Sequence, residues 1–479
     1  MNLRTLSCPL ITFVATLALH SSGFANEADR KDLLEGVSMI NAGGTPGGLC
    51  VSGPVALPLV AGQEGGARLP VVAASRMGKG RIVAYGHDGF LSAVKVRDTG
   101  RLLLNSIRWA AGERSMPRVG LLSVSDTPGV LSFLKEHDIE AVELQKGASL
   151  DGIDVLLMNG ITLDSDQIDS FGKWIRDGGG MLTGVTGWGW VQLRGGNDRA
   201  ALQTTCAANQ LFKEAGIAFS ASVPRRTAPD AYIAGGDLSL LNATAALEAL
   251  TSHTEGKTPL SPATLASCSI VLGDAIRSLP TDDTLLRPKL AALRGDDAAP
   301  PGPEHPIRRD AALQRLIITR DLESLRSTAP AEVKAHPAAA IFPGSVSADA
   351  PRVDSRTLTL DLSATRWQGT GLYAPAGEVV TIRIAPEYAG KGMAVRIGCH
   401  TDGLWHLGEW KRMPEISSRT LLKEPVTTVA SPFGGLIYID IPPAAPSIRI
   451  DVTITGAVQS PRFILGQSTT ADWKKHLSE

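Results

Sequence analysis

The chain has 479 residues, of which 43% are hydrophobic, and it carries 47 basic and 48 acidic side chains. This size and composition allow about three domains with sizeable hydrophobic cores. A formal net charge of −1, with both signs mixed along the chain, argues against a general nucleic-acid or polyanion binder.

The first residues have the pattern of a secretory signal. Arg4 gives a positive start, an apolar stretch follows from Pro9 to Leu19, and Gly23 and Ala25 are the small residues of a cleavage site. The apolar stretch is shorter than the roughly 20 residues that span a bilayer, although an N-terminal anchor or a buried segment is an alternative. We therefore expect residues 1–25 to be a signal peptide, and the mature protein to be secreted or periplasmic without a transmembrane segment.

Residues 33–235 have the pattern of an α/β domain. A hairpin is expected from two apolar strands at 69–74 and 81–85, joined by a glycine-containing turn. Further apolar strands are expected at 119–124, 141–144, 155–158 and 181–185, and they alternate with amphipathic helices that begin near Asp126 and Asp164. This alternation predicts a parallel sheet that is covered by helices on both faces.

The rest of the chain changes character twice. Residues 236–336 are mostly helical in pattern, and residues 337–355, rich in Ala, Pro and Ser, are typical of a linker. From residue 356 to 479, short strands are separated by Pro/Gly turns, which predicts a β-sandwich.

The cysteines do not suggest a metal or redox motif. Cys50, Cys206, Cys268 and Cys399 are widely separated, and none belongs to a C-x-x-C pair. Two disulfides in any of three pairings are compatible with an oxidising compartment, but buried free thiols are favoured.

The turn after the strand at 181–185 is a candidate site. Over residues 115–220 the layout resembles the flavodoxin-like fold of class I glutamine amidotransferases, which place a cysteine on such a strand-to-helix turn. Thr186 occupies that turn here, and no cysteine follows before Cys206, so we expect a non-catalytic version. Trp188 and Trp190 follow, and they either stack on a sugar or apolar ligand or seal the top of the sheet.

The histidines do not form the H-E-x-x-H motif of zinc peptidases. The closest cluster comprises His400, Asp402 and His406, and such residues more often order a turn than hold a metal. Trp405 and Trp410 lie in the same segment and are further candidates for ligand binding. His87-Asp88 follows a strand and is a candidate edge of a site. No catalytic or metal-binding residue is predicted.

Four segments near the C-terminus carry a family resemblance. They are TRWQGTGLYAPAGEVVTI (Thr365 to Ile382), VRIGCHTDGLWHLGEWKRMPEIS (Val395 to Ser417), SPFGGLIYI (Ser431 to Ile439) and GAVQSPRFILGQSTTADW (Gly456 to Trp473). They resemble the β domain that precedes the catalytic domain in the enhancin-like, mucin-targeting metallopeptidases of family M-60. The TRP-channel-associated factors of animals belong to the same wider group, and the segments Leu69 to Phe90 and Gly178 to Leu193 look like the N-terminal region of that group.

The resemblance implies an accessory role. In the family, the zinc-binding helix lies downstream of this β domain, so zinc is expected only if a separate or downstream peptidase domain exists, and no cofactor is expected in this chain. The implied function is to position a glycoprotein substrate, mucin-like in character. The alternatives are a stand-alone glycan- or protein-binding module and a cryptic amidotransferase-like hydrolase.

Overall fold

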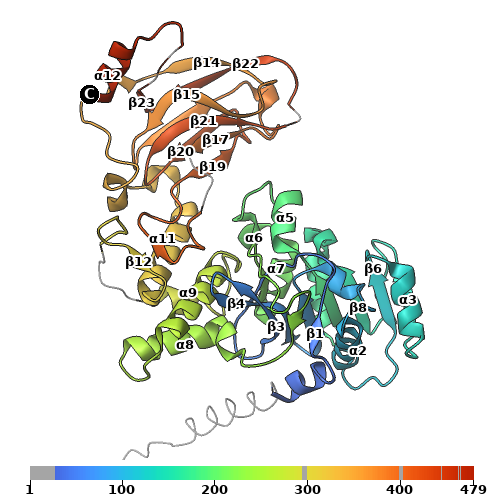
Figure 1. Cartoon of the computed structure of the whole chain (residues 1–479). Coiled ribbons are helices and arrows are strands. Elements are labelled where there is room, and N and C mark those ends of the chain that lie inside the picture. Colours follow the sequence, from blue (N-terminus) through green and yellow to red (C-terminus); the bar gives the residue numbers. More distant parts are fainter. Residues whose placement is uncertain are drawn as a thin grey trace, which may run out of the picture. The chain divides into compact units, whose positions relative to one another are not determined.

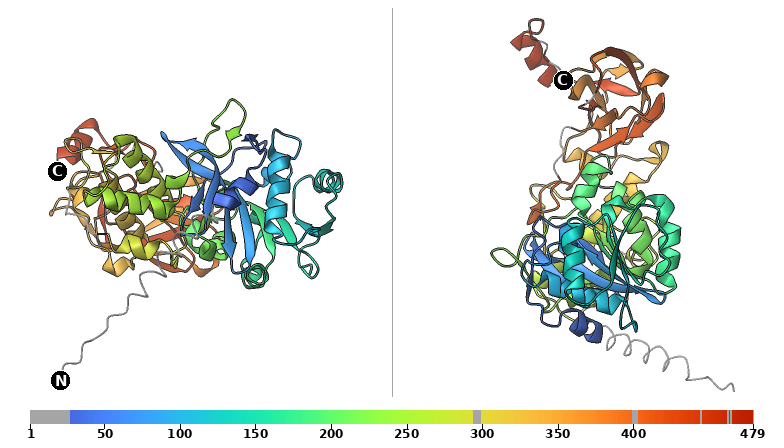
Figure 2. Two further views of the ribbon diagram at one scale, coloured as in Figure 1. Left: turned by 90° about the horizontal axis from the view of Figure 1, so that it is seen from below. Right: turned by 90° about the vertical axis from the view of Figure 1, so that its right-hand side faces the viewer.

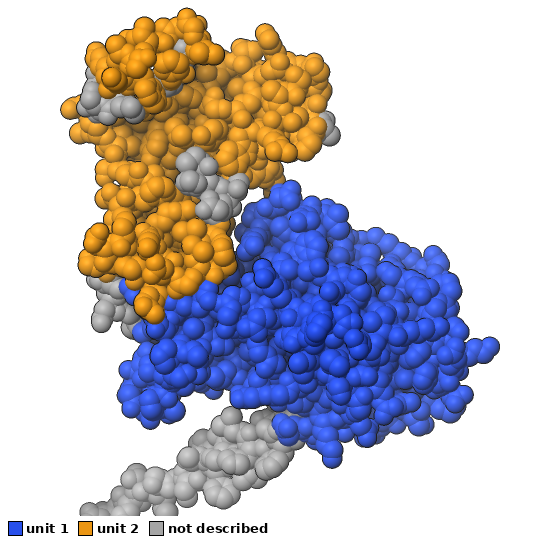
Figure 3. All heavy atoms as spheres, in the orientation of Figure 1, with its two compact units in different colours: residues 1–295, 309–320 blue, residues 296–308, 321–479 orange. Residues whose placement is uncertain are grey.

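The computed structural model describes residues 27–293, 299–398, 403–443, 445–461, 463 and 465–478. Two compact units are distinguished by colour in Figure 3. Unit 1 comprises residues 1–295 and 309–320, and unit 2 comprises residues 296–308 and 321–479, so the boundary falls within helix α11 (Ala312–Arg326). The signal-peptide prediction lies outside the described residues.

A seven-stranded sheet organises unit 1 (Figure 1). Its strand order is β3 (Leu57–Glu64), β4 (Ala67–Met77), β5 (Gly80–Tyr85), β9 (Gly180–Gly184), β8 (Val155–Asn159), β6 (Val119–Leu122) and β7 (Ala141–Leu144). The β3–β4 and β4–β5 pairs are antiparallel, and every pair from β5 to β7 is parallel. This confirms the predicted hairpin and the predicted parallel sheet.

Helices cover both faces of this sheet. Successive side chains of a strand point to opposite faces, so apolar strands have apolar side chains to bury on each face. In β9, Leu182 packs in a core with α2 (Thr99–Ala110) and α3 (Thr127–Lys135). The preceding residue, Met181, packs in a second core with α4 (Ile168–Arg176), α5 (Gly187–Leu193) and α7 (Ala207–Phe212). The near-continuous apolar strands are therefore explained by burial on both sides.

A third core joins further helices to the same unit. Buried residues of α8 (Ala243–Thr254), α9 (Pro262–Ile276) and α10 (Arg287–Ala291) share it with Leu69 of β4. The helices of this region, in yellow-green, lie beside the sheet (Figure 2). Short strand pairs complete the unit: β1 (Met39–Ile40) with β11 (Tyr232–Ile233), and β2 (Leu49–Val51) with β10 (Ile217–Phe219). No helix within the described ranges is both long enough and apolar enough to cross a membrane.

Two antiparallel sheets of unit 2 enclose one apolar core. The six-stranded sheet has the order β13 (Arg352–Val353), β23 (Ala457–Gln459), β15 (Arg366–Ala374), β21 (Gly435–Ile441), β17 (Ala394–Ile397) and β19 (Ser418–Leu421). The four-stranded sheet has the order β14 (Arg356–Asp361), β22 (Arg449–Thr455), β16 (Val379–Arg383) and β20 (Val426–Ala430). Ile439 and Val452, one from each sheet, are fully buried in the shared core. The chain is thus α/β followed by antiparallel β structure, as the sequence predicted.

Candidate functional site

The two tryptophans predicted after Thr186 lie on helix α5 and are mostly buried. Trp190 is only 4% exposed and belongs to the core between α5 and the sheet. A ligand therefore has no free face of Trp190 to stack on. Trp188 is partly buried, and its indole N–H is enclosed without a hydrogen-bond partner among the described residues.

The strand-to-helix turn offers no reactive thiol or hydroxyl. Thr186 is 5% exposed and stands at the N-cap of α5. Cys206 is fully buried before α7, and desolvation raises the pKa of its thiol to about 11. A protonated, enclosed thiol is a poor nucleophile. Nucleophilic chemistry of the amidotransferase type has no support here.

His87 and Asp88 lie at the carboxyl end of β5 and take part in local hydrogen bonds. The backbone N–H of Gly89 donates to His87 Nδ1 at 2.8 Å. Asp88 Oδ2 accepts from Ser125 Oγ and from Asn159 Nδ2, each at 3.2 Å. These contacts join the loops that follow β5 and β6 to the last residue of β8, so the pair orders this edge of the sheet.

The structure brings Trp405 and Trp410 of unit 2 together. Their ring centroids are 5.5 Å apart and the planes make an angle of 87°. Trp410 is 2% exposed, lies in β18 (Glu409–Trp410), and donates from Nε1 to the carbonyl of Leu404 at 2.9 Å. Trp405 stays partly exposed and donates to Glu415 Oε2 at 3.0 Å. Trp410 is thus a core residue of this loop, whereas Trp405 retains some exposed surface.

The other candidate residues of this loop, two histidines and an aspartate, do not form a metal or ligand site among the described residues. His400 and Asp402 lie outside the described residues, and His406 is exposed. Within the described ranges, no group of three or more His, Cys, Asp or Glu side chains has the arrangement of a metal site.

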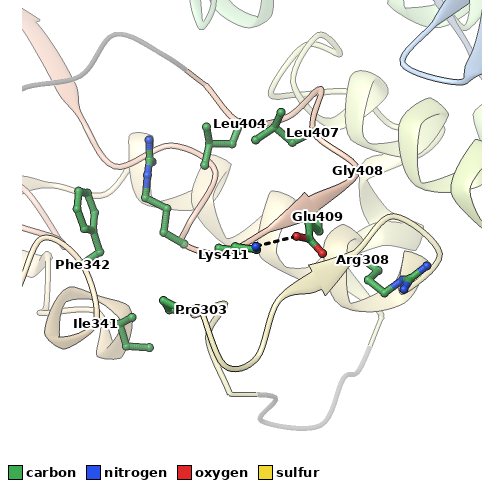
Figure 4. A pocket seen from close by; sticks show the side chains of 10 residues that line it. Pro303, Arg308, Ile341, Phe342, Leu404, Leu407, Gly408, Glu409 and Lys411 are labelled. Atoms are coloured by element: carbon green, nitrogen blue, oxygen red, sulfur yellow. Dashed lines mark ion pairs between the residues drawn. The ribbon is translucent and has the colours of Figure 1, made fainter.

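An open pocket of about 810 Å³ lies beside this loop within unit 2 (Figure 4). It is lined by residues from three segments: Pro303, Arg308, Ile341, Phe342, Leu404, Leu407, Gly408, Glu409, Lys411 and Arg412. The pairing of β12 (Ile307–Arg308) with β18 holds the first and third of these segments together.

The pocket combines apolar walls with a charged rim. Ile341, Phe342 and Leu407 are 45%, 36% and 38% exposed, and they gather on one concave surface. Glu409 pairs with Lys411 at 3.1 Å. The guanidinium carbon of Arg412 lies 5.4 Å from the ring centroid of Phe342.

The rim is cationic on balance. Arg308, Lys411 and Arg412 are positive, and Glu409 is the one acidic side chain among the lining residues. A concave apolar surface with a few charged groups is typical of ligand sites. This pocket therefore suits an apolar side chain that stands next to a negatively charged group.

A second group of side chains in unit 2 was not predicted as a site. Trp367 of β15 and Tyr438 of β21 have ring centroids 5.6 Å apart, and the guanidinium carbon of Arg396 lies 4.4 Å from the Trp367 centroid. Nearby, Arg419 Nε donates to Asp440 Oδ2 at 2.7 Å. These residues alternate with the core residues Ile437, Ile439 and Val395, so they lie on the outer face of the six-stranded sheet. This alternation of apolar core residues with polar or aromatic residues is visible in the sequence, and it could have indicated which residues lie on the outer face.

Two family models match separate parts of the chain. The model described as the N-terminal domain of M60-like peptidases matches residues 349–455. The model described as "TRPM8, N-terminal domain" matches residues 8–232.

Curated relatives match along most of this chain. TRPM8 channel-associated factor 1 of Pongo abelii is 25% identical, and the alignment covers 94% of this chain and 48% of that protein. TRPM8 channel-associated factor 3 of Mus musculus is 26% identical, with 94% and 47% covered. The chain thus spans about half the length of the curated relatives that it matches.

Solved structures give a weaker match. IMPa from Pseudomonas aeruginosa, solved in complex with an O-glycopeptide, is 16% identical with a TM-score of 0.46, covering 97% of this chain and 57% of that one. The sequence comparisons support the resemblance predicted above: the chain is similar to TRPM8 channel-associated factors along most of its length, and residues 349–455 match the N-terminal domain of M60-like peptidases.

Proposed function

We propose that this chain is an exported region that binds and positions a glycoprotein for an M60-like peptidase domain, and that it does not hydrolyse peptide bonds itself. The match of residues 349–455 to the N-terminal domain of M60-like peptidases supports the accessory part of the proposal. The sequence contains no H-E-x-x-H motif. Zinc-dependent hydrolysis would therefore come from a separate or downstream peptidase domain. Export rests on the signal-like residues 1–25.

The pocket beside residues 404–412 carries the proposal, because its concave, partly apolar surface suits a polypeptide side chain. An apolar side chain of the partner would pack on Phe342 and Leu407, and a neighbouring carboxylate would approach Lys411 or Arg412. Mucin-type glycoproteins supply carboxylates as acidic side chains and as sialic acid.

The test is binding to immobilised submaxillary mucin, measured by biolayer interferometry. Removing two of the apolar side chains from the walls with Phe342→Ser and Leu407→Ser should weaken binding by about tenfold or more, since each side chain contributes buried apolar area. Val426→Ser is the matched control, because Val426 is 45% exposed on β20, outside the lining residues. Wild-type affinity in the double variant, or equal losses in both variants, would contradict the proposal.

A glycan-binding module is the second candidate, favoured by the outer face of the six-stranded sheet. Aromatic rings next to arginine and carboxylate side chains provide stacking surface and hydrogen-bonding groups for a sugar. Trp367→Ala should then abolish binding of O-glycans released from the same mucin, whereas the pocket variants should leave it unchanged. Unchanged glycan binding in Trp367→Ala would rule this candidate out.

As part of the same proposal, unit 1 has the fold of class I glutamine amidotransferases and acts as a scaffold. This assignment is supported by the parallel order β5–β9–β8–β6–β7 and by the turn at Thr186 that joins β9 to α5. The burial of Thr186 and Cys206 favours a scaffold without catalysis over a cryptic hydrolase.

A further inference from the structure

The parallel sheet of unit 1 has a topological switch point at β6. From β6 the chain passes to its neighbour β7, and then returns to β8 on the other side of β6. In open α/β sheets, ligands bind outside the carboxyl ends of the strands at such a point.

A cavity of about 480 Å³ lies at this position. It is lined by residues at or after the carboxyl ends of β6, β7 and β8, together with Arg194 after α5: Leu122, Ser123, Lys146, Met158, Thr162, Asp164, Gln167 and Arg194. None of these residues belongs to the pocket of unit 2 or to the His87–Asp88 pair.

Two cations of this cavity share one carboxylate. Lys146 Nζ lies 2.5 Å from Asp164 Oδ2, and an Arg194 guanidinium nitrogen lies 2.5 Å from Asp164 Oδ1. The hydrogen bonds from Lys146 and Arg194 hold the pKa of the Asp164 carboxyl below its usual range, so Asp164 stays charged at neutral pH. Two positive charges against one negative charge leave the lining with an excess of positive charge.

Arg194 and Gln167 are held in place by hydrogen bonds within the protein. Arg194 donates to the carbonyl oxygen of Ile161 at 2.7 Å, which fixes the guanidinium over the loop after β8. The backbone N–H of Asp164 donates to Gln167 Oε1 at 3.0 Å in a capping box, which leaves the Gln167 amide N–H groups as donors. A preformed set of donors lowers the cost of ordering on binding.

We infer that this cavity binds a small oxyanion-bearing molecule, a carboxylate or a phosphate, through Lys146 and Arg194. The inference concerns unit 1 and does not depend on the proposed function of the pocket in unit 2. Lys146 keeps two further N–H donors beyond the one that contacts Asp164, and its side chain is 70% exposed, so it can turn to an incoming anion.

The test is isothermal titration calorimetry on the purified chain, with inorganic phosphate and with N-acetylneuraminic acid as separate probes. Saturable binding of one probe is expected, and the two titrations distinguish phosphate from carboxylate. Lys146→Met and Arg194→Gln should each weaken that binding by about tenfold, because each removes a charge-assisted hydrogen bond.

Asp164→Asn gives the sharper outcome. Asparagine remains a good N-cap, and the change removes the carboxylate that competes with the ligand, so affinity should rise by about fivefold. Lys173→Met is the matched control, because Lys173 forms an ion pair of the same length, 2.5 Å, with Asp177 outside the cavity. Circular dichroism of each variant checks that the fold is retained.

Three results would overturn the inference. One is the absence of saturable binding for both probes. Another is an affinity that survives Lys146→Met and Arg194→Gln. The third is a loss in Lys173→Met as large as in Lys146→Met, which would show general attraction of anions to surface charge.

Discussion

The indole rings of Trp405 and Trp410 meet edge to face, 5.5 Å apart, although only one of them is a core residue. Trp410 anchors the loop through its bond to the Leu404 carbonyl and through the β12–β18 pairing. Trp405 connects the loop to Glu415, which also pairs with Arg326 of α11. The walls of the unit 2 pocket therefore depend on two tryptophans that are not themselves among its lining residues.

Trp410→Ala should destabilise unit 2 by about 3–5 kcal/mol, because it removes a large buried side chain and leaves a cavity. Trp405→Ala should lower the free energy of unfolding by clearly less, since the Trp405 ring is partly exposed. Urea unfolding followed by circular dichroism measures both changes. Equal losses of stability in the two variants would contradict the assignment of Trp410 as the core residue of this loop.

Gly187→Ala should destabilise unit 1 by about 1–3 kcal/mol, because an added Cβ would overlap the carbonyl oxygen of Ser220. Gly189→Ala, on the same helix, is the control. Its added Cβ would lie 3.5 Å from Thr186 Cβ, an ordinary contact, and alanine favours a helix over glycine by about 1 kcal/mol. Thermal unfolding should show a lower midpoint for Gly187→Ala alone, and the reverse order would contradict the geometry.

The buried thiols predict a loss of stability at alkaline pH. Cys50, Cys206 and Cys268 are free and buried, and desolvation raises the thiol pKa of Cys206 and of Cys268 to about 11. In the unfolded chain a thiol titrates near pKa ~8.5. The unfolded state therefore loses these protons first, and the unfolding free energy should fall as pH rises from about 8.5 towards 11.

The measurement is urea unfolding at pH 7.5 and at pH 9.5, for the wild type and for Cys206→Ala. The pH-dependent loss should be smaller in the variant. Iodoacetamide labelling with peptide mass spectrometry gives an independent readout: the Cys206 and Cys268 peptides should be labelled only after unfolding. Rapid labelling of either in the native protein would contradict the buried state.

Periodicity and capping predicted the parallel sheet well, because these signals are local. The strands β6, β7, β8 and β9 lie where apolar runs were expected, and Asp126 accepts from the Gly129 N–H at the start of α3, as its sequence position indicated. Strand β15 is hard to predict from the sequence, because its glycines interrupt the alternation and its partner β21 lies in a distant part of the sequence.

The candidate sites were harder to predict, because burial and long-range pairing decide them. Tryptophan identity does not reveal that Trp190 and Trp410 are enclosed while Trp405 is partly exposed. The unit 2 pocket joins residues near 305, 341 and 408, and only the tertiary structure brings them together. Lys146 and Arg194 likewise meet at Asp164 from three separate segments.

Hydrogen–deuterium exchange of the purified chain, with and without submaxillary mucin glycopeptides, tests the proposed binding role most directly. Binding at the pocket should slow exchange in residues 404–412 and 339–343, which carry the pocket walls, and the glycopeptide masses should be unchanged after incubation. Protection confined to other segments, or cleavage of the glycopeptides by the chain alone, would contradict the proposed role.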